Sequence, residues 1–142
     1  MEHKVHRLWH FHPVMKGIIT LIAIFFCSAY ILQSQCPSSL LLYSQDDVDN
    51  FPINYPNCTH LEGKVEIGGD DITNLDGLSQ LQSIGAHLSI MGNTNLISIE
   101  GLGNVTHVEH FIQIMSNPSL ISLFGLNNLD SCNMELMIYG NN

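Results

Sequence analysis

Basic side chains are almost absent from this chain of 142 residues. Three of its four lysine and arginine residues, Lys4, Arg7 and Lys16, lie at the N-terminus, and only Lys64 follows them. From residue 35 onward this single lysine faces twelve of the thirteen acidic residues (all except Glu2), which gives a net charge of −11. Because such a field repels polyanions, we expect neither nucleic acid nor an anionic membrane surface as a partner.

The residue patterns needed for catalysis or metal binding are also missing. There is no Ser/His/Asp spacing, no Cys/His pair and no phosphate-cradling glycine loop, so we expect no enzyme and no cofactor. An H-x-x-H pair has two further histidines nearby but does not recur in register, so no zinc site is predicted: His60, His87, His107 and His110. Three clustered aspartates lack the glycine and distal glutamate of an EF-hand, and a helix dipole explains them without calcium: Asp46, Asp47 and Asp49.

Residues 1–34 have the pattern of an export signal. A basic stretch precedes an apolar run at 17–32, and Ser34 is a small residue ahead of a cleavage point before Gln35. The run has 16 residues, fewer than the roughly 20 that a membrane-spanning helix needs. We predict a signal peptide and a protein that is secreted or held at the cell surface or envelope. An uncleaved anchor at 17–32 is the alternative.

Export would place the cysteines in an oxidising compartment, where disulfides form. Cys27 lies in the apolar run, whereas Cys36 and Cys58 bracket the start of the exported chain. We predict a Cys36–Cys58 disulfide, which the chain-entropy model values at roughly 3 kcal/mol. Cys132 falls on an apolar position and is expected to be a small buried hydrophobe. Sequons begin at Asn57 and Asn104 and matter only in a eukaryotic secretory pathway.

Residues 35–62 are expected to cap the domain that follows. Ser44 and Asp47 have the spacing of a capping box, which marks the start of a helix. Two apolar residues follow at helical spacing, Val48 and Phe51. Pro52 is expected to end this helix, so we predict it at about 45–51. Its apolar face would cover the open end of the next strand, at Val65 and Ile67.

A 24-residue repeat occupies residues 63–142. Short strands are expected where two apolar residues alternate with an outward one, at 65–67, 88–90, 112–114 and 136–138. Asparagine recurs in the intervening corners, and we expect its side chains to stack as a ladder that bonds the backbone of the same or the adjacent coil: Asn93, Asn117 and Asn141. Glycine recurs as well, and we expect a side chain in its place to collide with the corner or with the next coil: Gly77, Gly101 and Gly125. A unit of this kind cannot bury its apolar side alone, so the units must stack, about 4.8 Å apart, as a solenoid.

The segments 57–59, 63–69 (Gly-Lys-Val-Glu-Ile-Gly-Gly) and 71–78 (Asp-Ile-Thr-Asn-Leu-Asp-Gly-Leu) resemble the opening of a receptor L domain. This leucine-rich-repeat-like fold occurs in the ectodomains of the EGF and insulin receptors, and similar arrays occur in secreted proteins of marine bacteria related to flavobacteria. The resemblance covers residues 36–142. It implies a mainly β fold, a right-handed parallel β-helix of about 3.5 coils with a helical, disulfide-pinned cap. Because the chain stops partway into a coil, we expect it to be the front of a longer protein.

The resemblance implies an extracellular recognition or adhesion module that binds protein or glycan without catalysis. Alternatives are a structural spacer of a longer surface adhesin and a β-helical polysaccharide-active enzyme, which would have only Lys64 as a base. The candidate ligand-binding residues point outward from the expected strands or flank them: Glu66, Ser89, Phe111, Gln113 and Met137. Phe111 and Met137 are expected to be exposed, as apolar anchors for a partner. A membrane contact is expected only through an uncleaved anchor or a missing C-terminal region.

Overall fold

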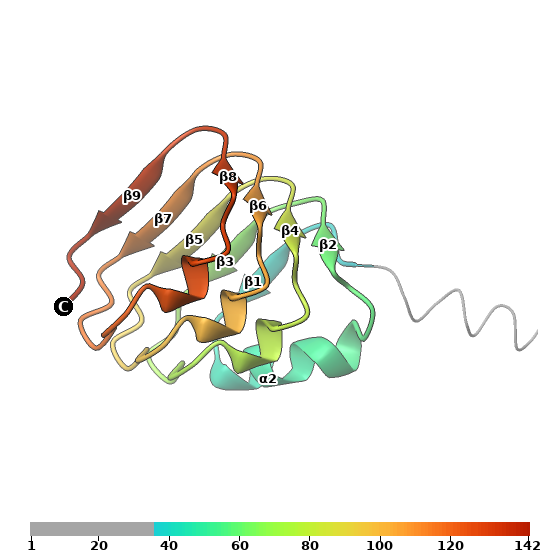
Figure 1. Cartoon of the computed structure of the whole chain (residues 1–142). Helices are drawn as coiled ribbons and strands as arrows, with labels where there is room; N and C mark the ends of the chain where they lie inside the picture. Colours follow the sequence, from blue (N-terminus) through green and yellow to red (C-terminus); the bar gives the residue numbers. More distant parts are fainter. Residues whose placement is uncertain (1–35) are drawn as a thin grey trace, which may run out of the picture. The chain divides into compact units, whose positions relative to one another are not determined.

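A computed structural model describes residues 36–142 of the chain, which are mainly β-structure (Figure 1). The export signal or anchor predicted at residues 1–34 lies outside these residues. Within the described part, no helix combines the length and the apolar character needed to cross a bilayer. Parallel strands form two sheets, and a single α-helix accompanies them.

The larger sheet has five parallel strands, and four of them were predicted. In spatial order they are β1 (Leu40–Leu42), β3 (Val65–Ile67), β5 (Leu88–Met91), β7 (Ile112–Met115) and β9 (Leu136–Tyr139). Ile90 pairs with Ile114, and Ile114 pairs with Ile138. The repeat therefore places identical positions side by side, as the apolar pattern required.

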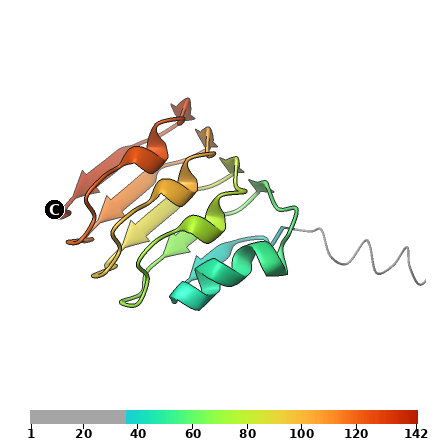
Figure 2. The ribbon, with the colours of Figure 1, turned by 60° about the horizontal axis from the view of Figure 1, so that its bottom comes forward.

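The smaller sheet was not predicted. It contains four parallel two-residue strands: β2 (His60–Leu61), β4 (Ser83–Ile84), β6 (His107–Val108) and β8 (Ser131–Cys132). The helical side of the units is formed by the helix α2 (Gln45–Asn54) and the 3-10 turns η1 (Asp76–Leu78), η2 (Glu100–Leu102) and η3 (Phe124–Leu126). Figures 1 and 2 show these elements aligned from one unit to the next. Strands of two residues are too short for an alternating pattern to reveal them.

The predicted cap is itself a unit of the stack, which corrects the expected division at residue 63. Leu40 pairs with Val65 through β1, and His60 pairs with Ser83 through β2. Strand β1, not the helix, therefore covers the edge of β3. Helix α2 instead packs on η1 at the level of Gly77.

The helix starts where it was predicted and ends later. The hydroxyl of Ser44 accepts a hydrogen bond from the backbone N–H of Asp47 (3.2 Å), and Val48 and Phe51 are buried. Pro52 lies inside the helix, which continues to Asn54, so the expected stop at Pro52 is wrong. A proline there deprives the carbonyl of Val48 of its helical partner. That carbonyl lies against Gly77 of the next unit, where a Cβ would overlap it.

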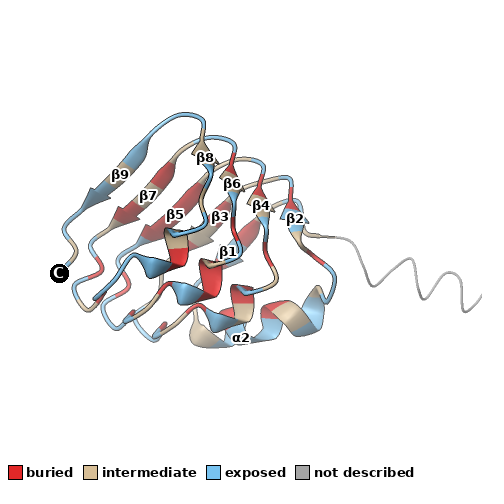
Figure 3. Ribbon diagram, viewed as in Figure 1, coloured by how far each residue is buried: buried red, intermediate tan, exposed pale blue. Residues whose placement is uncertain are grey.

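The apolar positions of the repeat form a single core between the two sheets and the helical side. Figure 3 shows the buried residues recurring at the same place in successive units as far as β7. On β9 the equivalent side chains are more open, with Leu136 51% and Ile138 39% exposed. Cys132 pairs with Val108 as predicted but is only half-buried, and its thiol donates to the carbonyl of His110 (3.0 Å). The predicted disulfide joins Cys36 to Cys58.

Asparagine side chains tie successive units together inside this core. The amide oxygen of Asn117 accepts from the backbone N–H (3.1 Å) and side-chain amide (2.8 Å) of Asn93. The amide of Asn117 in turn donates to Asn141 (3.0 Å) and to the carbonyl of Ile90 (3.1 Å). Asn93 and Asn117 are fully buried. The predicted asparagine ladder is confirmed, and it satisfies polar groups that would otherwise be costly to bury.

Glycine is required where the 3-10 turns of the helical side approach one another. A Cβ on Gly101 would overlap the backbone carbonyl of Leu75, and one on Gly125 would overlap that of Ile99. Each carbonyl belongs to the preceding unit. The predicted collision is therefore confirmed.

Candidate functional site

Three rows of side chains cross the outer face of the five-stranded sheet. The first row precedes the strands and holds Lys64, His87, Phe111 and Glu135. The second row holds Leu41, Glu66, Ser89, Gln113 and Met137. The third row follows the strand register through Tyr43, Gly68, Met91, Met115 and Tyr139. We call these three rows together the outer face.

All five candidate residues lie on the outer face, but they differ from the expected exposure. Glu66, Gln113 and Met137 are half-buried, and Ser89 is only 7% exposed. The small side chain of Ser89 lies between the longer Glu66 and Gln113 of the neighbouring strands. Ser89 therefore faces outward, as its strand position predicts, but exposes little of its surface to solvent.

Phe111 is likewise not a free anchor. Its ring stacks on the imidazole of His87, with ring centroids 4.6 Å apart and planes 8° from parallel, and it is half-buried. The two residues stand at the same position of successive units. The stacked pair forms a flat aromatic surface at the start of the strands.

The most exposed apolar residues of the face were missed. Tyr43 is 59% exposed, Tyr139 55%, Leu41 46% and Met91 43%. Tyr43 follows β1, which was not predicted, and Met91, Met115 and Tyr139 close strands that run one residue beyond the expected ends. The available signal was the recurrence of Met91, Met115 and Tyr139 at 24-residue steps.

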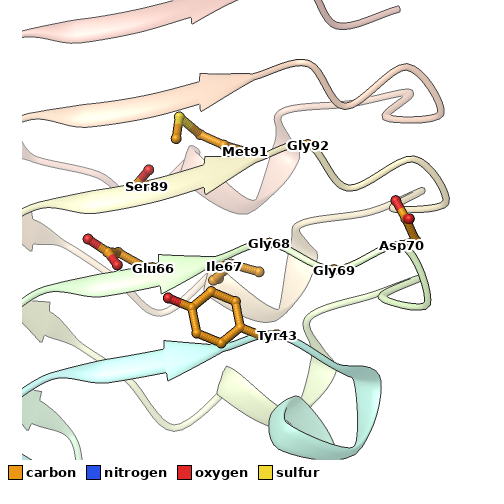
Figure 4. A pocket seen from close by; sticks show the side chains of 9 residues that line it. All are labelled: Tyr43, Glu66, Ile67, Gly68, Gly69, Asp70, Ser89, Met91 and Gly92. Carbon is orange, nitrogen blue, oxygen red and sulfur yellow. The ribbon is translucent and has the colours of Figure 1, made fainter.

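A hollow of about 540 Å³ opens on this face at the ends of β3 and β5. Its lining includes Tyr43, Glu66, Gly68, Ser89 and Met91 (Figure 4). It exists because Gly68 stands in the third row where the other units carry methionine or tyrosine. Beside it, the second row supplies only the small Ser89. Two short side chains among long neighbours leave the space empty.

Glu66, which lines the hollow, contacts two basic side chains. The ammonium of Lys64 lies 2.7 Å from Oε1 of Glu66, and Nε2 of His87 lies 3.5 Å from the same oxygen. The hydrogen bond from Lys64 lowers the pKa of Glu66 below its ordinary range. The pKa of Asp47 is lowered as well, chiefly because the backbone N–H of Tyr43 donates to its carboxylate (3.0 Å).

A second polar cluster lies on the smaller sheet. His107 contacts Oγ of Ser131 through Nδ1 (2.6 Å) and Oε2 of Glu109 through Nε2 (2.9 Å). These are the residue types of a nucleophilic triad, which the sequence reading did not bring together. The His60–Ser83 contact (2.8 Å) repeats the arrangement.

We read this cluster as a tie between strands. The backbone N–H of Ser131 already donates to the carbonyl of Thr106 (3.3 Å), so it is not free to stabilise an oxyanion. Hydrogen bonding to His107 lowers the pKa of Glu109. Across residues 36–142, no group of three or more His, Cys, Asp or Glu side chains is placed to hold a metal ion.

Comparison with known proteins gave no match to a family model, to a curated protein or to a solved structure. The function proposed next therefore rests on the geometry and chemistry of the chain itself.

Proposed function

We propose that residues 36–142 form a solenoid of the receptor L-domain type, a right-handed parallel β-helix, and that it is a non-catalytic extracellular recognition module. The in-register parallel pairing of both sheets supports the solenoid. The Cys36–Cys58 disulfide supports an oxidising, extracellular location. The outer face is the proposed binding surface, and its partner is a protein or a glycan.

The observation that carries this proposal is the contiguous apolar character of the outer face. Met91, Met115 and Tyr139 follow one another in register in its third row, and Met91 and Tyr139 are at least 43% exposed. Single exposed apolar residues are ordinary on protein surfaces, but contiguous ones are typical of binding sites. Tyrosine and methionine are also enriched in protein interfaces.

A structural spacer of a surface adhesin is the second candidate. It is favoured by the hydrogen bonds that link neighbouring units at exposed corners. Asn104 donates to the carbonyl of Ser79 and Asn128 to that of Gly103, each at 2.7 Å. Such ties stiffen a rod along its length whether or not any face of it binds a ligand.

A binding experiment with a matched pair of variants separates the two candidates. The purified chain of 142 residues is applied to arrays of extracellular proteins and of glycans, alongside Met91→Ala and Ile97→Ala. Met91 lies on the outer face (43% exposed), and Ile97, which is 50% exposed, does not. We expect binding that Met91→Ala reduces about tenfold and Ile97→Ala leaves unchanged.

Three outcomes would contradict the proposed function. Equal effects of the two substitutions, or no binding to any target, would favour the spacer. Turnover of an array polysaccharide by the protein would show that the module is catalytic.

A further inference from the structure

The hollow beside Gly68 is a vacancy in an otherwise regular row. Tyr43, Met91, Met115 and Tyr139 occupy the third row in the other units, and Gly68 alone has no side chain there. The resulting volume of about 540 Å³ lies within the ~300–1,000 Å³ range of small-ligand pockets. The hollow thus has room for the side chain of a partner together with some of its backbone.

The walls of the hollow combine apolar surface with one free carboxylate oxygen. Tyr43 lies on one side of Gly68 and Met91 on the other, and the hydroxyl end of Tyr43 points toward Glu66 (Figure 4). Lys64 and His87 both contact Oε1 of Glu66. The second oxygen, Oε2, makes no hydrogen bond within the described part of the chain.

This combination suits a side chain with an apolar stem and a cationic tip. Lysine and arginine lay their methylene stems along apolar surfaces while the charged end seeks a polar partner. A cation is also attracted to the face of a tyrosine ring. Here the stem would contact Tyr43 and Met91, and the tip would reach Oε2 of Glu66.

The charge of the surroundings selects the same partner. Two carboxylates line the hollow, on Glu66 and Asp70, against the single ammonium of Lys64, which contacts Glu66. The chain from residue 35 onward carries a net charge of −11. Complementary charge raises the rate of encounter and suppresses partners of the wrong sign.

We propose that the hollow is a binding site for a lysine or arginine side chain of a basic segment in a partner polypeptide. This inference rests on the proposed recognition function and names the chemistry of its partner. A neutral glycan stacked on Tyr43, or an acidic glycan paired with Lys64, would use the same surface in other ways.

Two substitutions in one ion pair distinguish these ligands by the sign of their effects. Glu66→Gln removes the carboxylate that a cationic tip would reach, so it weakens binding of a basic peptide. Lys64→Gln removes the competing ammonium, so it strengthens that binding. A carboxylated glycan would respond in the opposite directions. Both side chains are about one-third exposed, so the fold should tolerate either change.

The test is a ¹H–¹⁵N NMR titration of the full chain at low ionic strength, where charge effects are least screened. The probes are a decapeptide of alternating lysine and serine, its glutamate–serine counterpart and a neutral oligosaccharide. We expect the lysine peptide to shift the amide signals of Gly68, Gly69 and Ser89. Glu66→Gln should weaken its binding about threefold, and Lys64→Gln should strengthen it about twofold.

Glu135→Gln is the matched control, since it removes the same charge from an exposed position elsewhere on the outer face. Equal weakening by Glu135→Gln and Glu66→Gln would mean diffuse attraction and would overturn the inference. Binding of only the neutral or the acidic probe in the hollow would overturn it too, while leaving the recognition function standing. That function itself fails only on the array experiment with Met91→Ala and Ile97→Ala.

Discussion

Replacing Asn117 with alanine tests how much the asparagine ladder contributes to stability. The side chain makes four hydrogen bonds, two as acceptor from Asn93 and one each as donor to Ile90 and Asn141. It is fully buried. At about 1 kcal/mol for each bond, with a further penalty for the orphaned N–H of Asn93, the loss is about 4–5 kcal/mol. Domains of this kind have only about 5–15 kcal/mol in total.

The assay is urea unfolding of the full chain followed by far-UV circular dichroism. Asn128→Ala is the matched control, because Asn128 is exposed and its side chain makes a single hydrogen bond, to Gly103. We expect the control to lose about 1 kcal/mol or less. If Asn117→Ala were no more than about 1 kcal/mol less stable than Asn128→Ala, buried hydrogen bonds would not be what couples the units.

Four further substitutions probe the corners and helix α2 by the same unfolding assay. Gly101→Ala should lower the free energy of unfolding by about 3 kcal/mol because its Cβ meets a carbonyl of the preceding unit. Gly92→Ala, at φ +70° in open space, should lower it by only about 1 kcal/mol. Equal losses would argue against the close approach at Gly101. Ser116 has φ 55° where the equivalent residues are glycines, so Ser116→Gly should stabilise by about 0.5–1 kcal/mol, and a loss would refute left-handed strain. A backbone N–H lowers the pKa of Asp47, so its stabilising effect is present above its ordinary pKa of 3.8 and is lost as pH falls through the lower folded value. The stability gap between wild type and Asp47→Asn should therefore close in acid, and a gap that widened would contradict the assignment.

Much of the fold was predictable because the same apolar, glycine and asparagine positions recur in each repeat. Ile90, Ile114 and Ile138 align as their spacing required. The first unit escaped detection because α2 replaces a 3-10 turn and its spacing differs from that of the others. Its strand β1 reads Leu-Leu-Leu, which has no alternation to mark a face.

The candidate site was predicted in outline, and its most distinctive part was not. An outward position is easily assigned from the period of a strand, and Glu66 and Gln113 lie where the alternation put them. How deeply a position is buried depends on its neighbours across strands, so the burial of Ser89 does not follow from the period of its strand. The hollow depends on Gly68 standing opposite Met91, and that pairing appears only once the register is known.

The alignment of repeat units defines the outer face, so it is the claim to test most directly. Methyl-labelled isoleucine in the full chain allows a nuclear Overhauser experiment on Ile90, Ile114 and Ile138. Neighbouring strands lie about 4.8 Å apart, so we predict cross-peaks from Ile90 to Ile114 and from Ile114 to Ile138, and none from Ile90 to Ile138. A missing neighbour cross-peak, or a strong one between the outer pair, would contradict the stacking and with it the position of the binding face.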